Sequence, residues 1–300
     1  MYPQINGVIG GIHQGRKPMK RFVVAVAAAA LAIATGAIAQ DKPLIVGFDG
    51  TFAPHAMPKM GGGIEGFNVD LILEAGKRMG RKIEIFNAEF SGLIPAMNAG
   101  KIDFLGAPTT VTPERTHQML FSEGYLNTFY AFVVPAAKPD LKSLADLKGK
   151  TLSTNKGTPT DKWLQDNAAK YEYKSLAYGT TTDAIQSVIT GHTDATLTGN
   201  TVSAYAVLRS NGQLKLATLN VDQGLVWAAA FRKDDVKLRN AFEDVLECMK
   251  LDGTVVKLAE KWFGSKVAGG PAASTVYPGY GVPGPGYGGY DPTPHTPKCK

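Results

Sequence analysis

Residues 67–107 read "FNVDLILEAGKRMGRKIEIFNAEFSGLIPAMNAGKIDFLGA" and decide the class of fold. Residues 67–80 carry apolar side chains at helical spacing and end on a glycine, which predicts a helix that stops there. Residues 82–86 alternate apolar and polar side chains, as a half-buried strand does. A second helical run follows at 91–100, and residues 102–107 form a second apolar strand. Because helices alternate with strands, this stretch predicts a parallel sheet in an α/β domain.

The same alternation continues on both sides of this stretch. Residues 44–48, "LIVGF", are short and apolar, so we expect a strand before the first helix. Farther along, periodicity predicts helices at 143–150, 159–170, 181–191, 201–211, 236–253 and 254–264, and strands at 151–155, 193–198, 214–219 and 225–231.

The distribution of charge argues against a nucleic-acid partner. The chain has 300 residues, 44% of them apolar, and a net charge of +6. Residues 1–39 hold four basic residues and no acid, and the part after Gly264 holds three lysines against one aspartate. The segment 40–264 is therefore close to neutral, without the basic surface that nucleic acid requires.

Residues 19–39 have the three parts of a secretory signal. Two basic residues are followed by a short apolar run and by an Ala-Ile-Ala cleavage pattern ahead of Gln40. A transmembrane anchor is the alternative, but the apolar run is shorter than the ~20 residues that a spanning helix needs. We therefore expect export to the periplasm, and we interpret residues 1–18 as a misassigned extension ahead of a true start at Met19.

The composition changes after Gly264. Residues 265–300 are rich in proline, glycine and tyrosine and carry almost no aliphatic side chains, so we expect a disordered tail. The two cysteines are Cys248, in a predicted helix, and Cys299, near the end of the tail. Export would permit a disulfide, but we expect Cys248 to be a buried free thiol.

No motif for a cofactor, a metal or catalysis is convincing in its context. Residues 61–66, "GGGIEG", match the glycine pattern of a dinucleotide site, but ten residues separate Gly61 from Gly50 at the end of the preceding strand. The five histidines are scattered without metal-ligand spacing. No G-x-S-x-G segment marks a nucleophile. We therefore expect no cofactor, no metal and no catalytic residue.

Six segments in order resemble the extracytoplasmic solute-binding proteins of polar amino acid ABC transporters. The resemblance runs from about Leu44 to Gly264. It implies the two-lobed α/β fold of type II periplasmic binding proteins, in which each lobe is a mostly parallel sheet flanked by helices and a double hinge lets the lobes close on a ligand. Lobe 1 would span 43–126 plus 227–264, and lobe 2 would span 127–226. The segments are "LIVGFDGTFAP" (44–54), "GFNVDLILEAGKRMG" (66–80), "FSGLIPAMNAGKID" (90–103), "TTVTPERTHQMLFSEGY" (109–125), "LADLKGKTLSTNKGT" (144–158) and "LDGTVVKLAEKWFG" (251–264).

The resemblance also implies which residues bind the ligand. In this family the arginine of a T-x-T-x-x-R segment pairs with the ligand's α-carboxylate, and the match here is Thr110, Thr112 and Arg115. A guanidinium offers two parallel donors to a planar carboxylate. The alternative is a structural ion pair between Arg115 and a carboxylate of the protein itself. The complete expected site is Asp49, Phe52, Phe90, Ala107, Thr110, Arg115, Asn155, Thr158, Thr198 and Asn200.

Two departures from the family pattern concern the ligand's α-ammonium. The aspartate that usually holds this group falls on Gly199, and Pro159 lacks a main-chain N–H that the family often supplies. Burying an ammonium without a counter-charge is costly. Either Asp49 takes that role or the ligand carries a carboxylate and no α-ammonium. If the alignment is right, Gly199→Asp should raise the affinity for amino acids.

We therefore expect a periplasmic substrate-binding protein of an ABC importer, with no enzymatic activity. It would be a monomer that binds a small carboxylate-bearing solute, an amino acid or a derivative of one, and delivers it to a permease. One alternative is an enzyme on the same fold that resembles cyclohexadienyl dehydratases, for which Glu89 and Asp49 are the acid–base candidates. Another is a sensory or surface protein, which only the tail suggests.

Overall fold

The structure is a computed structural model that describes residue 11 and residues 42–264, 269–297 and 299. The expected signal at 19–39 lies outside the described residues, as does the proposed N-terminal extension apart from Gly11. No described helix is long and apolar enough to cross a membrane.

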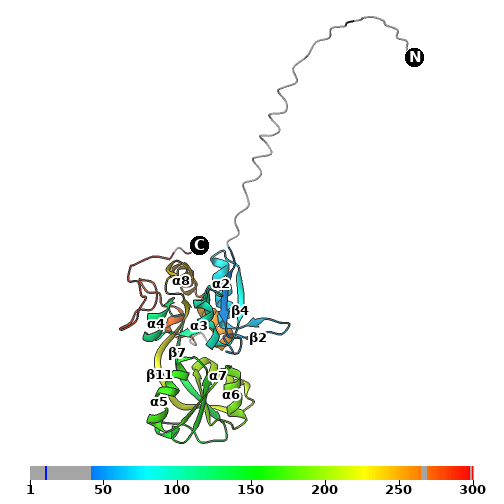
Figure 1. The fold of residues 1–300 in the computed structure, drawn as a ribbon, viewed down its shortest axis with the longest axis vertical. Coiled ribbons are helices and arrows are strands. Elements are labelled where there is room, and N and C mark those ends of the chain that lie inside the picture. The colour runs from blue at the N-terminus through cyan, green and yellow to red at the C-terminus, as the bar shows by residue number, and fades with distance from the viewer. Residues whose placement is uncertain (1–10, 12–41, 265–268, 298, 300) are drawn as a thin grey trace, which may run out of the picture. The chain divides into compact units, whose positions relative to one another are not determined.

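The stretch that predicts the fold forms the centre of one lobe (Figure 1). β1 (Leu44–Phe48) lies between β4 (Ile83–Asn87) and β5 (Phe104–Thr110), and the three strands are parallel. α2 (Phe67–Arg78) and α3 (Phe90–Asn98) are the crossover helices between them. Every residue of β5 is buried, as expected for a parallel strand that is covered on both faces.

Later parts of the chain complete this lobe. They are α4 (Pro113–Gln118), β6 (Leu120–Phe121), α8 (Val236–Leu251) and α9 (Thr254–Phe263). The start of α4 is determined locally, because the Thr112 side chain accepts the N–H of Arg115 and a proline occupies the first turn. The short helix that carries Arg115 is therefore set at its N-terminus by its own sequence.

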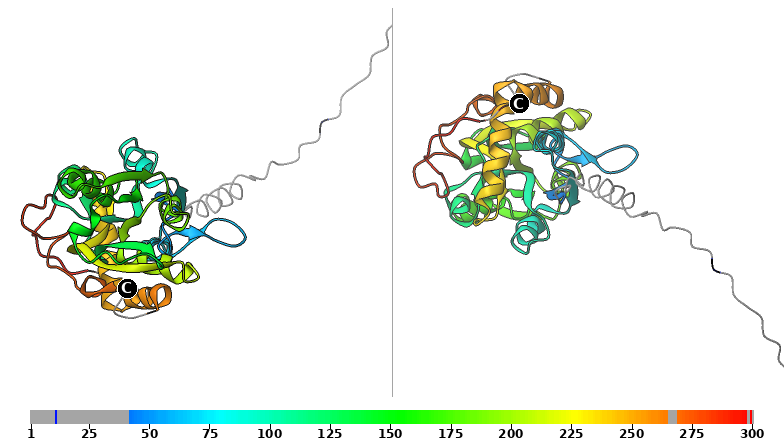
Figure 2. Two further views of the ribbon diagram at one scale, coloured as in Figure 1. Left: turned by 90° about the horizontal axis from the view of Figure 1, so that it is seen from below. Right: turned by 90° about the horizontal axis from the view of Figure 1, so that it is seen from above.

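The glycine-rich segment 61–66 is a turn. It connects β2 (Met57–Pro58) to β3 (Ile64–Glu65) in a two-stranded hairpin that projects from the lobe (Figure 2). The glycines at 61–63 all have positive φ, which glycine adopts at no steric cost. Met60, in the hairpin loop, is 97% exposed.

The second lobe contains another parallel group of strands. β8, β9 and β10 pair in parallel, and helices follow each of them. The sequence analysis missed β9, whose five residues are mostly polar or half-exposed. The elements are η1 (Leu144–Leu147), β8 (Thr151–Asn155), α5 (Pro159–Tyr171), β9 (Lys174–Tyr178), α6 (Thr181–Ile189), β10 (Ala195–Gly199) and α7 (Asn200–Arg209).

Two long antiparallel strands join the lobes. β7 (Leu126–Pro135) carries the chain out, and β11 (Leu214–Phe231) brings it back. Two strands were predicted at 214–219 and 225–231. They form one strand, because the register against β7 shifts twice without ending the strand. The sheet order β4-β1-β5-β11-β7-β10-β8-β9 is therefore continuous across both lobes. We place the lobe boundaries at these crossings, with 43–126 and 227–264 in lobe 1 and 127–226 in lobe 2.

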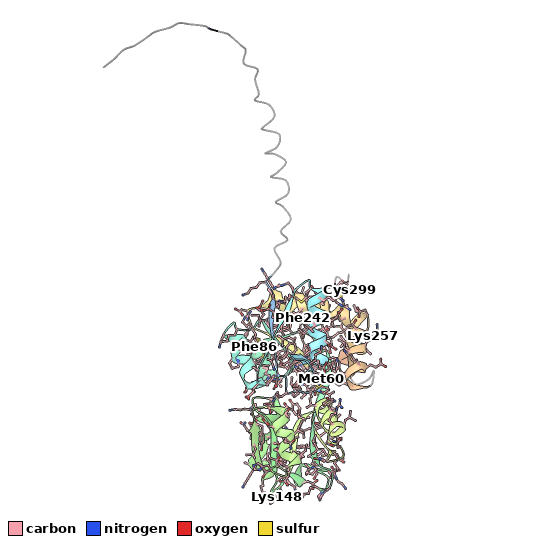
Figure 3. All side chains as sticks on the ribbon, turned by 90° about the vertical axis from the view of Figure 1, so that its right-hand side faces the viewer. Met60, Phe86, Lys148, Phe242, Lys257 and Cys299 are labelled. Atoms are coloured by element: carbon pink, nitrogen blue, oxygen red, sulfur yellow. A yellow bond between two sulfur atoms is a disulfide. The ribbon has the colours of Figure 1, made fainter. Side chains whose placement is uncertain are left out.

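Each lobe has its own hydrophobic core. In lobe 1, Phe104, Phe231 and Phe242 pack ring against ring, with centroids 5.0 to 5.6 Å apart. In lobe 2, Phe132 lies in a separate cluster with buried leucines of β8, α5 and β10. Figure 3 shows Phe242 in one lobe and Lys148 at the far end of the other. Separate cores allow the lobes to move as two bodies.

The C-terminal segment 269–297 packs against lobe 1, so the expectation of a disordered tail is wrong for these residues. In Figure 2 it runs alongside the helices of that lobe. Its short helix η3 (Pro271–Ala273) is held by Asn127, which accepts the N–H of Ala272 at 2.9 Å. The main-chain N–H groups of the segment also reach buried acidic residues. Docking through the backbone does not require aliphatic side chains, which is why composition misled the prediction.

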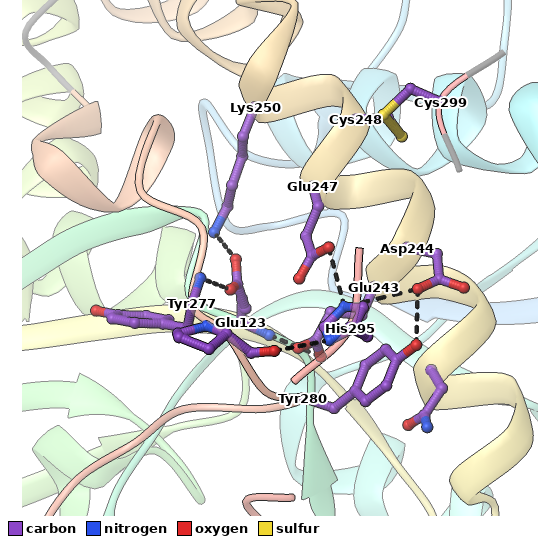
Figure 4. Close-up of polar contacts among 12 residues, drawn as sticks. Glu123, Glu243, Asp244, Glu247, Cys248, Lys250, Tyr277, Tyr280, His295 and Cys299 are labelled. Carbon is purple, nitrogen blue, oxygen red and sulfur yellow. Dashed lines mark hydrogen bonds and ion pairs between the residues drawn. A yellow bond between two sulfur atoms is a disulfide. The ribbon is translucent and has the colours of Figure 1, made fainter. Parts of the chain in front are cut away.

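The two cysteines form a disulfide, so the expectation of a free thiol is also wrong. Cys248 in α8 is bonded to Cys299, with the two Cα atoms 5.3 Å apart. The packed segment returns along α8 and brings the end of the chain to Cys248 (Figure 4).

Candidate ligand-binding cleft

A cavity of about 30 Å³ lies between the lobes, with room for only a water molecule or two. Its walls come from the carboxyl ends of β1, β5, β8 and β10, where α/β proteins usually bind ligands. Nine of the ten predicted residues line it: Asp49, Phe52, Phe90, Ala107, Thr110, Arg115, Asn155, Thr158 and Thr198. The other lining residues are Pro108, Tyr130, Pro159, Thr160, Gly199 and Trp227.

Arg115 lies at the edge of this cavity, and the hydrogen bonds of its guanidinium to described residues run to main-chain carbonyls. Its guanidinium donates to the main-chain carbonyls of Thr110 at 3.3 Å and Gly157 at 3.2 Å, and it lies 5.5 Å from the ring centroid of Phe90. Among the ion pairs of the described residues none includes Arg115, so the structural ion pair considered above is not present there. Loss of hydration lowers the pKa of Arg115 to about 10, and the group is still charged at neutral pH.

Asp49 uses both carboxylate oxygens within the protein. One oxygen accepts the N–H and the hydroxyl of Thr51, at 2.9 and 2.7 Å. The other accepts the N–H of Phe90 and the side-chain amide of Asn155, both at 3.2 Å. Asp49 therefore organises the cleft and has little capacity left for a ligand ammonium. Asn155 Oδ1 is buried and has no hydrogen-bond partner among the described residues, so it offers an acceptor to a ligand donor.

The lobes are closed on one another. The bond from Asn155 to Asp49 crosses between them, as does that from the Thr181 N–H to the Thr51 hydroxyl at 3.2 Å. Deeper in the interface, His55 Nε2 lies 2.7 Å from the hydroxyl of Thr201 in α7. Burial lowers the pKa of His55 to about 3, so the ring is neutral and takes part as a hydrogen-bonding group only.

The sequence analysis missed two aromatic walls, Tyr130 of β7 and Trp227 of β11. Trp227 lies in the segment predicted at 225–231 as an apolar strand, whereas Tyr130 lies in β7, a strand that the sequence analysis did not predict. Trp227 is 2% exposed, and its indole N–H donates to the hydroxyl of Thr110 at 3.0 Å. With Phe52 and Phe90, these residues give the cavity four aromatic side chains.

Trp227 also fills the space beside Gly199, the position to which the missing aspartate was aligned. A Cβ on Gly199 would lie 2.4 and 2.6 Å from two carbons of the Trp227 ring. Trp227 is buried and hydrogen-bonded, so it has little freedom to move away. This changes the expectation for Gly199→Asp, because an acidic side chain does not fit there.

Two further predicted residues have roles different from those expected. Asn200 does not line the cavity, and its side-chain oxygen accepts the hydroxyl of Thr128 at 3.1 Å. Thr158 does line it, but its hydroxyl donates to the Asn155 carbonyl at 2.6 Å and caps α5 by accepting the N–H of Asp161. Thr158 therefore shapes the loop that carries Asn155.

A second acidic group for acid–base catalysis is absent from the lining of the cavity. Glu89, the residue considered for that role, is exposed and lies outside the lining. Asp49 alone provides a carboxylate, and its oxygens are already hydrogen-bonded. The lining therefore offers groups that hold a ligand and no pair of groups that would transfer protons.

Comparison with known proteins agrees with this interpretation. Residues 44–265 match the model of the bacterial extracellular solute-binding proteins, family 3. The chain is 31% identical to the ABC transporter arginine-binding protein 1 of Escherichia coli (strain K12), over 82% of this chain and 99% of that protein. It is also 31% identical to the probable amino-acid-binding protein YxeM of Bacillus subtilis (strain 168), over 83% and 97%. A solved ancestral arginine-binding protein bound to arginine aligns with a TM-score of 0.71 at 34% identity, covering 75% of this chain and all of that one.

Two α/β lobes that share one sheet and meet around a cavity at the carboxyl ends of their strands define a binding protein of the type II periplasmic class. The chain belongs to the bacterial extracellular solute-binding proteins, family 3, and it is a binding protein rather than an enzyme.

Proposed function

We propose that the protein is the periplasmic receptor of an ABC importer and binds an amino acid, or a related small carboxylate, by closure of its two lobes. The observation that carries this proposal is Arg115, a half-buried guanidinium at the cavity edge without an acidic partner among the described residues. A ligand carboxylate would supply the missing charge through two parallel hydrogen bonds. We further propose that residues 19–39 direct export and that the protein acts as a monomer with a membrane permease.

The aromatic walls and the free acceptor suggest how the rest of the ligand is held. Phe52, Phe90 and Trp227 offer apolar contact, and Asn155 Oδ1 offers an acceptor to an ammonium, amide or hydroxyl group. The relatives named above are arginine-binding proteins and a probable amino-acid-binding protein, which makes amino acids the first ligands to test.

Calorimetry with the twenty amino acids and with simple carboxylic acids tests this function. Arg115→Ala should weaken the best ligand about 30-fold or more, because removing a charge-assisted bidentate contact costs about 2–5 kcal/mol. Arg209→Ala removes an exposed arginine of α7 outside the cavity and serves as the control. An Arg115→Ala variant that keeps wild-type affinity would remove Arg115 from the site.

A further inference from the structure

A second group of polar side chains lies outside the cleft, where the C-terminal segment meets α8 (Figure 4). Asp244 and Glu247 are one turn apart on α8 and point toward His295 of the segment. His295 Nε2 is 3.0 Å from Glu247 Oε2 and 3.7 Å from Asp244 Oδ1. One nitrogen and two carboxylate oxygens, from parts of the chain about 50 positions apart, thus converge on one point.

The hydrogen bonds of the His295 ring leave Nε2 facing two acceptors. Nδ1 lies 3.0 Å from the carbonyl oxygen of Pro278, which can only accept, so Nδ1 carries the proton of a neutral ring. The unshared pair of Nε2 then points at two carboxylates. Metal-binding histidines show this arrangement, with the second ring nitrogen donating to a carbonyl. Tyr280 stacks on His295 with centroids 3.7 Å apart and holds the ring in place.

Glu247 gives an independent reason to expect a cation. Its side chain has no exposed surface, and Oε1 has no hydrogen-bond partner among the described residues. Glu123 and Glu243 lie close by, but Lys250 bonds to Glu123, and two N–H groups bond to Glu243. Among the described residues, Glu247 is thus a buried carboxylate whose hydrogen-bond partner is His295, and an uncompensated buried charge is costly.

We propose that Asp244, Glu247 and His295 bind a divalent transition-metal ion, Zn²⁺ being the best match, and that this ion fastens the C-terminal segment to α8. His295 Nε2 lies 3.0 Å from Glu247 Oε2 and 3.7 Å from Asp244 Oδ1. These distances lie on either side of the separation of about 3.3 Å expected between two ligand atoms that are each bonded at about 2.0 Å to a tetrahedral ion. The Asp244 side chain is 43% exposed, which gives an ion access and leaves room for water as a fourth ligand.

The neighbouring groups support the site. The Tyr280 hydroxyl donates to Asp244 Oδ1 at 2.9 Å and so orients that carboxylate. Cys248 adjoins Glu247, and Cys299 follows His295 by four positions, so the disulfide holds both sides of the site together before any ion binds. The histidine spacing alone could not predict this site, because its ligands meet only when the segment docks.

Titration of metal-free, disulfide-intact protein with Zn²⁺ at pH 7.5 tests the proposal by calorimetry and by the shift in melting temperature. We expect one equivalent to bind and to raise the melting temperature. His295→Ala and Asp244→Asn should each weaken Zn²⁺ binding at least tenfold. Tyr280→Phe should weaken it by about tenfold, as loss of a group that orients a ligand does. Urea denaturation without metal checks that each variant is folded.

His192→Ala and Asp234→Asn remove an exposed histidine and an exposed aspartate elsewhere, and they should bind Zn²⁺ as the wild type does. The proposal is overturned if the wild type binds no stoichiometric Zn²⁺, which would leave His295 as a hydrogen-bond partner of Glu247. It is also overturned if both His295→Ala and Asp244→Asn bind Zn²⁺ as tightly as the wild type. Mg²⁺ binding with the same affinity would assign the ion to carboxylates alone and exclude His295.

Discussion

At the scale of single residues, ligand recognition in the cleft depends on which polar groups already have hydrogen-bond partners within the protein. Both oxygens of Asp49 accept hydrogen bonds from the protein, whereas within the described part of the chain Arg115 donates to carbonyls and Asn155 Oδ1 has no hydrogen-bond partner. The unsatisfied groups are therefore a cation and a neutral acceptor. That balance favours a ligand whose carboxylate is its main recognition group.

The Gly199–Trp227 contact leads to a prediction opposite to the one from sequence. Gly199→Asp should not raise the affinity for any amino acid, and it should lower the free energy of unfolding by about 1–3 kcal/mol, the usual cost of overpacking. Gly199→Ala should show the steric part of this loss, because a Cβ already meets the Trp227 ring at 2.4 Å. Urea denaturation measures both variants.

The control for this prediction replaces Trp227, the residue that contacts Gly199. In a Trp227→Leu background, Gly199→Ala should cost clearly less than in the wild type, because the two changes act on one space. An equal cost in both backgrounds would mean that Trp227 does not occupy the space beside Gly199.

At the scale of elements, α8 is the surface on which the C-terminal segment is ordered. The N–H of Gly281 donates to Glu243, and Lys250 donates to the carbonyl of Thr275 at 2.7 Å. Glu243 and Lys250 are buried under the segment. The segment therefore satisfies polar groups that lobe 1 would otherwise leave exposed or unpaired.

Replacing both cysteines, as Cys248→Ser with Cys299→Ser, should lower the free energy of unfolding by about 2–4 kcal/mol. The disulfide closes a loop between residues 51 positions apart, and without it the unfolded chain gains entropy. Urea denaturation provides the measurement. A reducing agent should destabilise the wild type similarly and leave the double variant unchanged. An unaltered midpoint in the double variant would show that the disulfide does not support the docked segment.

At the scale of the whole molecule, the two lobes meet through few polar bonds and are joined by two strands. β11 changes register against β7 between Val221 and Leu225, and Gly224 has a φ of 88° there. This local irregularity in β11, one of the two strands that join the lobes, is a natural place for a hinge. The described structure corresponds to the closed form.

A bulky side chain introduced at the edge of the cleft should keep the two lobes from closing. Gly179 of lobe 2 faces Glu89 of lobe 1, and a Cβ on Gly179 would lie 2.9 Å from the Glu89 carboxylate. Gly179→Phe should therefore prevent full closure and weaken the best ligand by about tenfold or more, since closed-lobe contacts are lost. Small-angle scattering should show a ligand-dependent decrease in radius of gyration for the wild type and none for Gly179→Phe.

Gly92→Phe adds the same bulk at a position whose Cβ meets open space, and it should behave as the wild type. A decrease in radius of the same size in Gly179→Phe would contradict closure at this contact.

The sequence alone determined the α/β order, most elements and much of the cleft. Residues 67–107 carry helix and strand periodicity locally, and Thr112 and Pro113 start the helix of Arg115 by local hydrogen bonding and backbone geometry. Arg115, Asp49 and Asn155 were assigned to one site through the family resemblance, and in the structure all three line the cavity at the carboxyl ends of the strands.

Only the tertiary structure decided which distant groups meet. Trp227 lies against Gly199, Cys248 bonds to Cys299, and His295 reaches Glu247. None of these pairs shares a local pattern, because each depends on how strands cross or on where a segment of backbone docks. A Pro/Gly-rich segment has no periodicity to predict its place, and it is ordered by hydrogen bonds to buried acids and by a covalent link. The physical reason is that periodicity reports burial along one element, whereas side-chain neighbours are set by the packing of several.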